Sequence, residues 1–114
     1  MQHAHLQFGE GFRVVVNDRR SQAAQMTIRP GQSEGGRENF HRGADQWLFI
    51  VSGTGRAIVN GKRVPLRRGT LLFIRRGDRH EIKNTGKTPL RTLNIYVPPA
   101  YTEFGNERPA GRPG

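Results

Sequence analysis

The chain of 114 residues contains no cysteine. Disulfide bonds, thiolate metal ligands and a cysteine nucleophile are therefore excluded, and any metal ion has to be held by histidine, carboxylate or amide oxygen. No stretch approaches the roughly 18 consecutive apolar residues of a membrane-spanning helix. The segment from Met1 to Glu10 lacks the apolar core of a signal peptide. We therefore expect a cytoplasmic protein that does not associate with membranes.

Acidic residues are also scarce, with nine Asp and Glu against 19 Lys and Arg and a formal net charge of +10. Such a charge can attract nucleic acid or small anions. The arginines are spread along the chain, however, without a basic helix and without aromatic residues interleaved among them. We therefore interpret most of them as solvated surface residues and keep nucleic-acid or anion binding as a minor alternative.

Turn-forming residues are plentiful, since 15 Gly and seven Pro separate short apolar runs that show no sustained helical period. These runs predict nine strands: Arg13–Val16, Gln25–Arg29, Asn39–Arg42, Trp47–Ser52, Gly55–Asn60, Lys62–Leu66, Thr70–Ile74, His80–Asn84 and Leu90–Val97. Asn60-Gly61 between two such runs favours a hairpin with a type I′ turn. Strands at this close spacing predict an all-β sandwich or barrel.

The length allows one domain. We expect an N-terminal arm over residues 1–12, a β-barrel over residues 13–97 and an extended Pro- and Gly-rich tail over residues 98–114.

The run Trp47–Val51 is apolar on both faces of its predicted strand. Leu48 and Ile50 can fill the interior, because alternate side chains point to opposite sides. Trp47, Phe49 and Val51 then need a second cover, which the N-terminal strands or a neighbouring subunit can supply. We expect a homodimer on this ground.

A small set of polar residues shares the predicted inward parity. Asn39 and His41 are two residues apart and therefore lie on one strand face. Gln46 has the parity of the inward residues of its own strand, and His80 and Asn84 begin and end another inward row. Two imidazoles with amide oxygens suit a divalent ion such as Zn, Ni, Mn or Fe(II).

The spacing of these residues resembles the two sequence blocks of the cupin superfamily. The second block reads Gly, five residues, Pro-x-Gly, two residues, His, three residues, Asn. Here it corresponds to Gly69, Gly77, His80 and Asn84, with Arg75 in place of the proline.

The first block of that family reads His-x-His, three or four residues, Glu, six residues, Gly. Counting back from Gly53 places Gln46 at the glutamate, His41 at the second histidine and Asn39 at the first. The leading glycine is out of register. The alternative of placing His41 at the first histidine leaves too few residues before Gln46.

The resemblance implies a small single-domain cupin, which is a double-stranded β-helix or jelly-roll barrel. It also implies a divalent metal ion held by His41, His80, Gln46 and Asn39. The usual ligand set of metal-dependent cupins is three His and one Glu, so the site here lacks one imidazole and its only anionic ligand. Glu38 and Asp45 lie beside the departing positions and can replace them if the strand is bulged.

Other residues have simpler interpretations. Asn84 precedes Thr85-Gly86-Lys87 and is expected to satisfy a turn. His3 and His5 are expected to be mobile. Tyr96 and Tyr101 can line the barrel mouth or pack against it. The remaining candidates are arginines that can clamp a carboxylate or phosphate: Arg75, Arg76 and, on the face opposite to His41, Arg42.

Three functions fit these residues. The first is a metal-dependent small-molecule enzyme of the oxidoreductase, dioxygenase or isomerase type, in which the ion carries the chemistry because no nucleophile–base pair is evident. The second is a module that binds a sugar or small acid in the barrel without turnover. The third is a nucleic-acid or anion binder. The fold itself does not choose among them.

Overall fold

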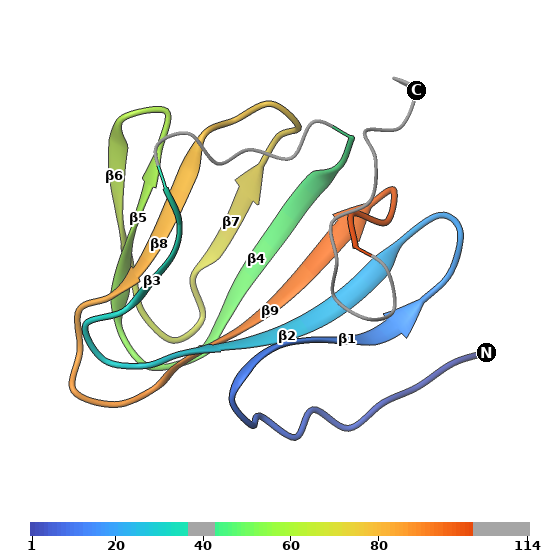
Figure 1. The fold of residues 1–114 in the computed structure, drawn as a ribbon, viewed down its shortest axis with the longest axis horizontal. Coiled ribbons are helices and arrows are strands. Elements are labelled where there is room, and N and C mark those ends of the chain that lie inside the picture. The colour runs from blue at the N-terminus through green and yellow to red at the C-terminus, as the bar shows by residue number, and fades with distance from the viewer. Residues whose placement is uncertain (37–42, 102–114) are drawn as a thin grey trace.

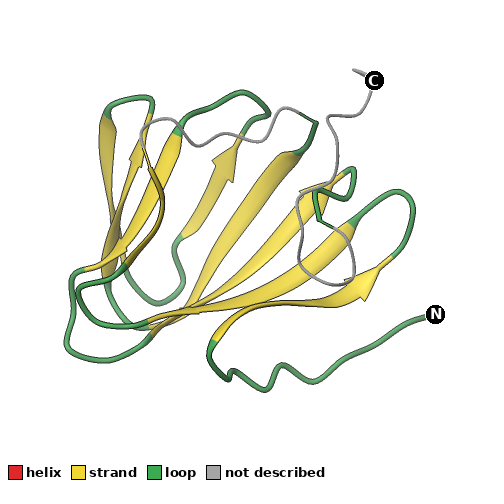
Figure 2. Cartoon of the chain, viewed as in Figure 1, coloured by secondary structure: helices red, strands yellow, loops and turns green. Residues whose placement is uncertain are grey.

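The computed structural model describes residues 1–36 and 43–101. All regular secondary structure in these residues is β-strand (Figure 2). The strands are β1 Gly11–Asn17, β2 Gln22–Ile28, β3 Ser33–Gly36, β4 Asp45–Ser52, β5 Gly55–Val59, β6 Lys62–Leu66, β7 Leu71–Ile74, β8 His80–Asn84 and β9 Leu90–Val97. In this part of the chain no helix is long and apolar enough to cross a bilayer.

The strands form two antiparallel sheets (Figure 1). The larger sheet has the order β1-β2-β9-β4-β7 and the smaller has the order β3-β8-β5-β6. The sheets face each other, close together at one end and wider apart at the other. This arrangement confirms the predicted double-stranded β-helix.

The core lies between the two sheets. Leu48 and Ile50 of β4 are fully buried, as the alternation along Trp47–Val51 predicts. They belong to one cluster with Ile82 and Ala57 of the smaller sheet, so residues from both sheets share one hydrophobic core. Burial of such a cluster is the main force that holds the sheets together.

The Asn60-Gly61 hairpin is also confirmed. Both residues have positive φ, 49° and 82°, and the flanking strands β5 and β6 pair directly across them. A type I′ turn requires this geometry, which Asn and Gly adopt at low cost.

One strand of the structure is absent from the sequence prediction. Ser33–Gly36 forms β3 by pairing with β8, from Ser33 opposite Lys83 to Gly36 opposite His80. Its Ser-Glu-Gly-Gly sequence resembles a turn. The segment is a strand because it pairs with β8, not because of its local propensity. The predicted strand Asn39–Arg42 lies outside the described residues.

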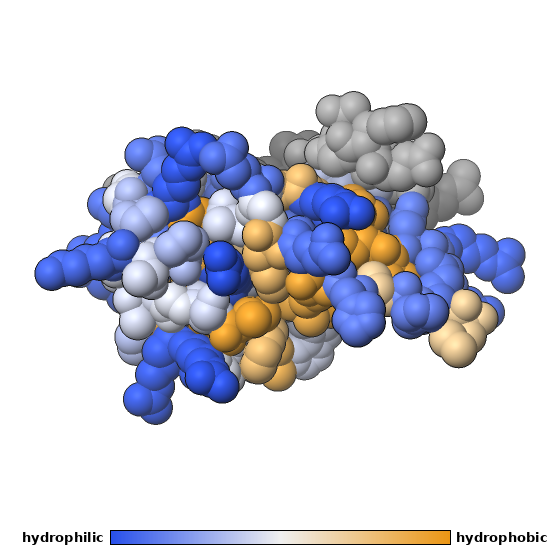
Figure 3. Space-filling model, turned by 90° about the horizontal axis from the view of Figure 1, so that it is seen from below, coloured by the Kyte–Doolittle hydropathy of each residue, from blue (hydrophilic) through white to orange (hydrophobic). Residues whose placement is uncertain are grey.

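The outer face of the larger sheet is apolar over β4, β7 and β9. Its most exposed members are Trp47, Phe49, Leu71, Phe73 and Val97. Figure 3 shows apolar side chains gathered near the middle of the molecule between hydrophilic flanks.

The N-terminal residues cover the other part of this face. Gln25 of β2 is buried and donates its side-chain N–H to the carbonyl of Gln7 at 2.8 Å. Phe8 lies beside the guanidinium of Arg91.

Candidate functional site

Gln46 and His80 lie at the same end of the barrel on facing sheets (Figure 1). Gln46 is at the start of β4 and pairs with Ile74, the last residue of β7. His80 begins β8, a short loop further along the chain. Both side chains are buried, at 3% and 5% exposure. The β7–β8 loop therefore runs from Ile74, the strand partner of Gln46, to His80.

Two aspartates fix this loop. Asp45 accepts hydrogen bonds from the backbone N–H of Arg76 at 2.9 Å and from its side chain at 3.4 Å. Asp78 accepts the N–H of Arg75 at 2.9 Å and the side-chain N–H of Asn60 at 2.8 Å. The loop is thus tied both to the start of β4 and to the β5–β6 turn. These contacts hold the strand ends that carry Gln46 and His80 in place.

A buried polar row continues from Gln46 along β9. Gln46 Nε2 donates to Asn94 Oδ1 at 3.2 Å, and Asn94 Nδ2 donates to Thr92 Oγ1 at 3.1 Å. Asn94 and Thr92 are fully buried. The remaining oxygen, Gln46 Oε1, is buried and has no hydrogen-bond partner among residues 1–36 and 43–101. An unsatisfied buried acceptor costs about 1–3 kcal/mol, so this oxygen is a site for a donor or a cation.

His80 is held as a neutral imidazole with a defined tautomer. Burial lowers its pKa, and the carbonyl and carboxylate of Asp78 only partly oppose this effect. Its Nδ1 lies 3.3 Å from the carbonyl oxygen of Asp78. Because a carbonyl can only accept, Nδ1 carries the hydrogen and Nε2 carries the lone pair. Metal-binding histidines are commonly oriented in this way.

The other predicted site residues differ in what the structure shows of them. Asn39 and His41 lie outside the described residues, as do Glu38 and Arg42. Asp45 and Arg76 bind each other, so neither is directed to a ligand in the barrel.

Asn84 satisfies a turn as expected. Its side chain donates to the carbonyls of Ile28 and Thr88, both at 2.8 Å, and accepts from the N–H of Gly86 at 2.9 Å.

Tyr96 packs within the barrel. Its ring lies 5.1 Å from that of Tyr101 and 6.5 Å from that of Phe12, measured between centroids. Burial, followed by the neighbouring Tyr101, raises its pKa well above the ordinary value. Tyr101 is anchored by Gln22, which accepts its backbone N–H at 3.1 Å.

Sequence reasoning missed the polar row of β9. Thr92, Asn94 and Tyr96 are buried and alternate with Leu93 and Ile95, so this strand places its polar side chains inward. The sequence signal that could have predicted this row is the alternation of polar and apolar residues along β9. Glu34 was also missed. It pairs with the core residue Ile82 and therefore shares its inner face, although it remains exposed at the edge strand.

The family model described as "Cupin domain" matches residues 24–96. The chain belongs to the cupin family. It is 38% identical over 66 residues to the tetracenomycin polyketide synthase protein TcmJ of Streptomyces glaucescens, covering 58% of this chain and 43% of that protein. It is 36% identical over 74 residues to an oxalate-binding protein of Thermotoga maritima, covering 65% and 60%.

This cupin therefore spans less than two thirds of those curated relatives. Among solved structures, a Bacillus halodurans protein superimposes with a TM-score of 0.77 at 22% identity, covering 87% of this chain and 76% of the other. That likeness supports the fold alone.

The motif glycines have a physical basis in this cupin. Gly53 has φ of 92°, and a Cβ there would lie 2.6 Å from the carbonyl oxygen of Pro89. Gly69 and Gly77 also have positive φ. The positions that match the family spacing are therefore backbone turns that a side chain would strain.

The donor chemistry at this end of the barrel fits a divalent metal ion. Among the described residues no three His, Cys, Asp or Glu come together. The donor groups described here are the neutral imidazole of His80 and the oxygen of Gln46, which has no hydrogen-bond partner among the described residues. Both are good ligands for first-row divalent ions, but neither is anionic. An ion bound here gains less electrostatic energy than at a site with a glutamate.

Proposed function

We propose that this cupin binds a small polar molecule in its barrel through a divalent metal ion held by His80, Gln46, His41 and Asn39. The observation that carries the proposal is the buried Gln46 oxygen, which has no partner in the described part of the chain. It lies at the same barrel end as a histidine whose tautomer places the lone pair on Nε2. A cation would supply the partner that the Gln46 oxygen lacks, and a neutral imidazole is a ligand that such an ion accepts. Zn, Ni, Mn and Fe(II) all accept such donors.

A small acid is the ligand class that we favour. The name of the Thermotoga relative refers to oxalate, and an acid can bind the ion directly through its carboxylate. If turnover occurs, it is of a metal-dependent type such as oxygen activation or isomerisation, because the ion would supply the electrophile.

The second candidate is a metal-free binding module. It is favoured by the neutral amide of Gln46 at the position of the family's glutamate, which removes the anionic ligand. In that case the Gln46 oxygen accepts a hydroxyl or N–H of the ligand itself.

Metal titration of the purified protein separates the two candidates. We expect stoichiometric binding of Zn or Ni to the wild type and at least tenfold weaker binding to the double variant His41→Ala, His80→Ala. The matched control is His3→Ala, His5→Ala, which removes the same number of imidazoles from the N-terminal segment and should leave the affinity unchanged. Equal affinity of the wild type and the His41/His80 variant would refute the metal site.

We also propose that two copies of the chain associate through the apolar outer face of β4, β7 and β9. Trp47 and Phe73 form its centre, with ring centroids 4.4 Å apart. The five most exposed side chains of this face together present roughly 400 Å² of apolar surface, a size that often marks a contact site. Two such faces with their rims bury about 1,000 Å² or more, near the lower limit of specific interfaces.

A second copy is the partner that this chemistry favours. A protein with a net charge of +10 repels its own copies wherever cationic surfaces meet. The exposed residues Trp47, Phe49, Leu71 and Phe73 carry no charge, so this face allows association without that repulsion. A twofold axis also places the same apolar patch opposite itself.

A further inference from the structure

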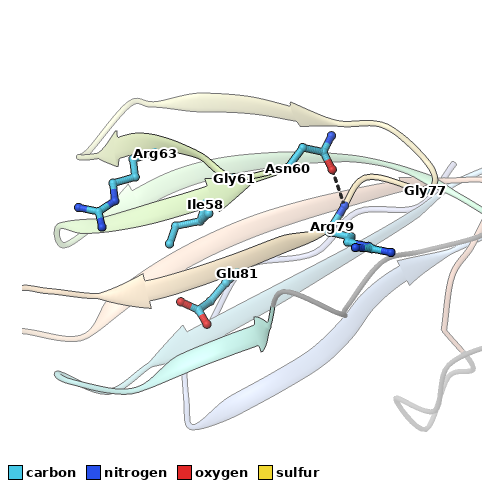
Figure 4. A pocket seen from close by; sticks show the side chains of 7 residues that line it. All are labelled: Ile58, Asn60, Gly61, Arg63, Gly77, Arg79 and Glu81. Carbon is cyan, nitrogen blue, oxygen red and sulfur yellow. Dashed lines mark hydrogen bonds between the residues drawn. The ribbon is translucent and has the colours of Figure 1, made fainter.

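An open cavity lies outside the barrel, on the outer face of the smaller sheet. Its volume is about 650 Å³, which is within the range of small-molecule sites. Its lining comes from β5, β6, β8 and the two turns at their ends, and includes Ile58, Asn60, Arg63, Arg79 and Glu81 (Figure 4). Glu81 follows His80 on β8 and therefore points to the opposite side of the sheet. The cavity is thus distinct from the barrel interior.

Strand register builds the floor of this cavity. Ile58 of β5 pairs with Glu81 on one side and with Arg63 on the other. The three side chains therefore form one row, with Ile58 between the two charged groups, as Figure 4 shows. The charged residues stand two strand spacings apart, about 10 Å. They form no ion pair with each other.

Hydrogen bonds between the two turns fix the remaining wall. Asn60 donates its backbone N–H to the carbonyl of Arg79 at 2.8 Å, and its side-chain oxygen accepts the N–H of Arg79 at 3.0 Å. A further bond from Asn60 to Asp78 at 2.8 Å holds the same turn. The backbone that carries the Arg79 guanidinium is therefore preorganised, although the side chain itself is exposed.

The charged side chains of the cavity form no ion pair with another described residue. The ion pairs found within the described residues join Arg29 to Glu10 and Arg76 to Asp45. Arg63, Arg79 and Glu81 take part in neither. Two guanidinium groups against one carboxylate leave the cavity with a net positive charge, and guanidinium groups bind carboxylates and phosphates in a bidentate manner.

We propose that this cavity binds a small hydroxylated anion, such as a sugar phosphate or a sugar acid. Arg79 binds the anionic group, Arg63 at the opposite end of the cavity donates hydrogen bonds to the hydroxyls, Glu81 accepts hydrogen bonds from them, and Ile58 contacts the carbon skeleton. A ligand with a second carboxylate near Glu81 is disfavoured by repulsion. The proposal does not depend on the metal site, because none of these residues faces the barrel interior.

Isothermal titration calorimetry with glucose 6-phosphate and with gluconate tests the proposal. It also shows whether the cavity prefers a phosphate or a carboxylate. We expect at least one of them to bind with Kd below about 1 mM. Sorbitol, which has no charge, should not bind, and inorganic phosphate, which has no carbon skeleton, should bind about tenfold more weakly. Absence of binding by both sugar anions up to about 10 mM would refute the proposal.

Single variants identify the site. Arg63→Ala and Arg79→Ala should each weaken binding about tenfold or more, because each removes a charge-assisted hydrogen bond. Arg68→Ala is the matched control: it removes the same charge from an exposed position outside the cavity and should leave Kd unchanged. Equal weakening by Arg68→Ala would indicate diffuse electrostatic attraction and overturn the proposal.

The barrel variant His80→Ala separates this site from the proposed metal site. Binding of the sugar anion should survive this substitution if the outer cavity holds it. Loss of binding in His80→Ala, with Arg63→Ala and Arg79→Ala unaffected, would place the ligand in the barrel and overturn the outer site.

Discussion

Gln46 donates its side-chain N–H to Asn94 Oδ1, and its own side-chain oxygen is buried with no hydrogen-bond partner within the described residues. Asn94 in turn donates to Thr92. The donor and acceptor roles in this row of hydrogen bonds can be reversed. An amide can rotate by 180° and a hydroxyl can act as donor or acceptor. The network can therefore accommodate either an amide or a carboxylate at position 46.

This relationship leads to a gain-of-function prediction. In Gln46→Glu the amide of Asn94 can rotate to donate to the new carboxylate, while Thr92 donates to the exchanged oxygen. The variant then supplies the anionic ligand that the wild type lacks, and we expect Mn and Zn affinity to rise about tenfold or more.

Metal titration of both proteins measures this change. Gln32→Glu is the matched control, since it introduces the same charge at an exposed position and should not alter the affinity. If Gln46→Glu binds no tighter than the wild type, Gln46 is not directed at a metal ion.

Asp45 stabilises the fold through the β7–β8 loop. The backbone N–H of Arg76 is the largest cause of its lowered pKa, and the Arg76 side chain adds to it. We expect Asp45→Asn to reduce the free energy of unfolding by about 1–2 kcal/mol at neutral pH, an amount that allows for solvent screening of this partly exposed pair. Arg76→Ala should cost less, because it retains the backbone donor.

The same shift predicts a pH dependence. The folded-state pKa of Asp45 lies below the ordinary value of 3.8, so the unfolded chain takes up the proton first as pH falls. The stabilisation is fully present above that value and is lost as pH falls through the folded-state pKa. Urea unfolding from pH 7 to pH 3 should show the difference between wild type and Asp45→Asn shrinking at the acid end. A constant difference would contradict the assignment.

The strand pattern was predictable where side-chain alternation is strong. Leu48 and Ile50 were assigned to the core because they alternate with Trp47 and Phe49, and the structure confirms both sides of this strand. Asn60-Gly61 was predictable because only a few residue types adopt positive φ readily.

The features that were missed depend on contacts between distant segments. Nothing local in Ser33–Gly36 favours a strand, and β8 supplies its hydrogen bonds. The cavity around Ile58 likewise depends on the register of three strands. Its lining residues Ile58 and Glu81 pair directly although they are more than 20 positions apart in the sequence. The spacing of the motif located Gln46 and His80 in the sequence. Their common position at one barrel end required the β4–β7 pairing.

The glycine at position 53 should be essential for stability. Its φ of 92° disfavours any side chain, and a Cβ would approach the carbonyl oxygen of Pro89 to 2.6 Å. We expect Gly53→Ala to lower the free energy of unfolding by about 2 kcal/mol or more. Gly9→Ala is the control, because a Cβ at that position would meet no atom within 4 Å and the φ of Gly9 is not in the left-handed region. Similar denaturation midpoints for the two variants would argue against this cause.

The apolar face of β4, β7 and β9 predicts a concentration-dependent dimer. Trp47 lies at its centre against Phe73 and is 42% exposed. In Trp47→Lys a twofold axis brings two new ammonium groups close together in a protein that is already strongly cationic. We therefore expect the dimer Kd to rise about tenfold or more, with little change in the monomer fold, since this residue is not part of the core.

Sedimentation equilibrium of both proteins measures this effect. Ser33→Lys adds the same charge to an exposed position on the other sheet and should leave the dimer intact. A wild type that remains monomeric at about 100 μM would refute self-association through this face. A dimer that Trp47→Lys leaves unchanged would place the contact elsewhere, and the apolar face would then need a different cover.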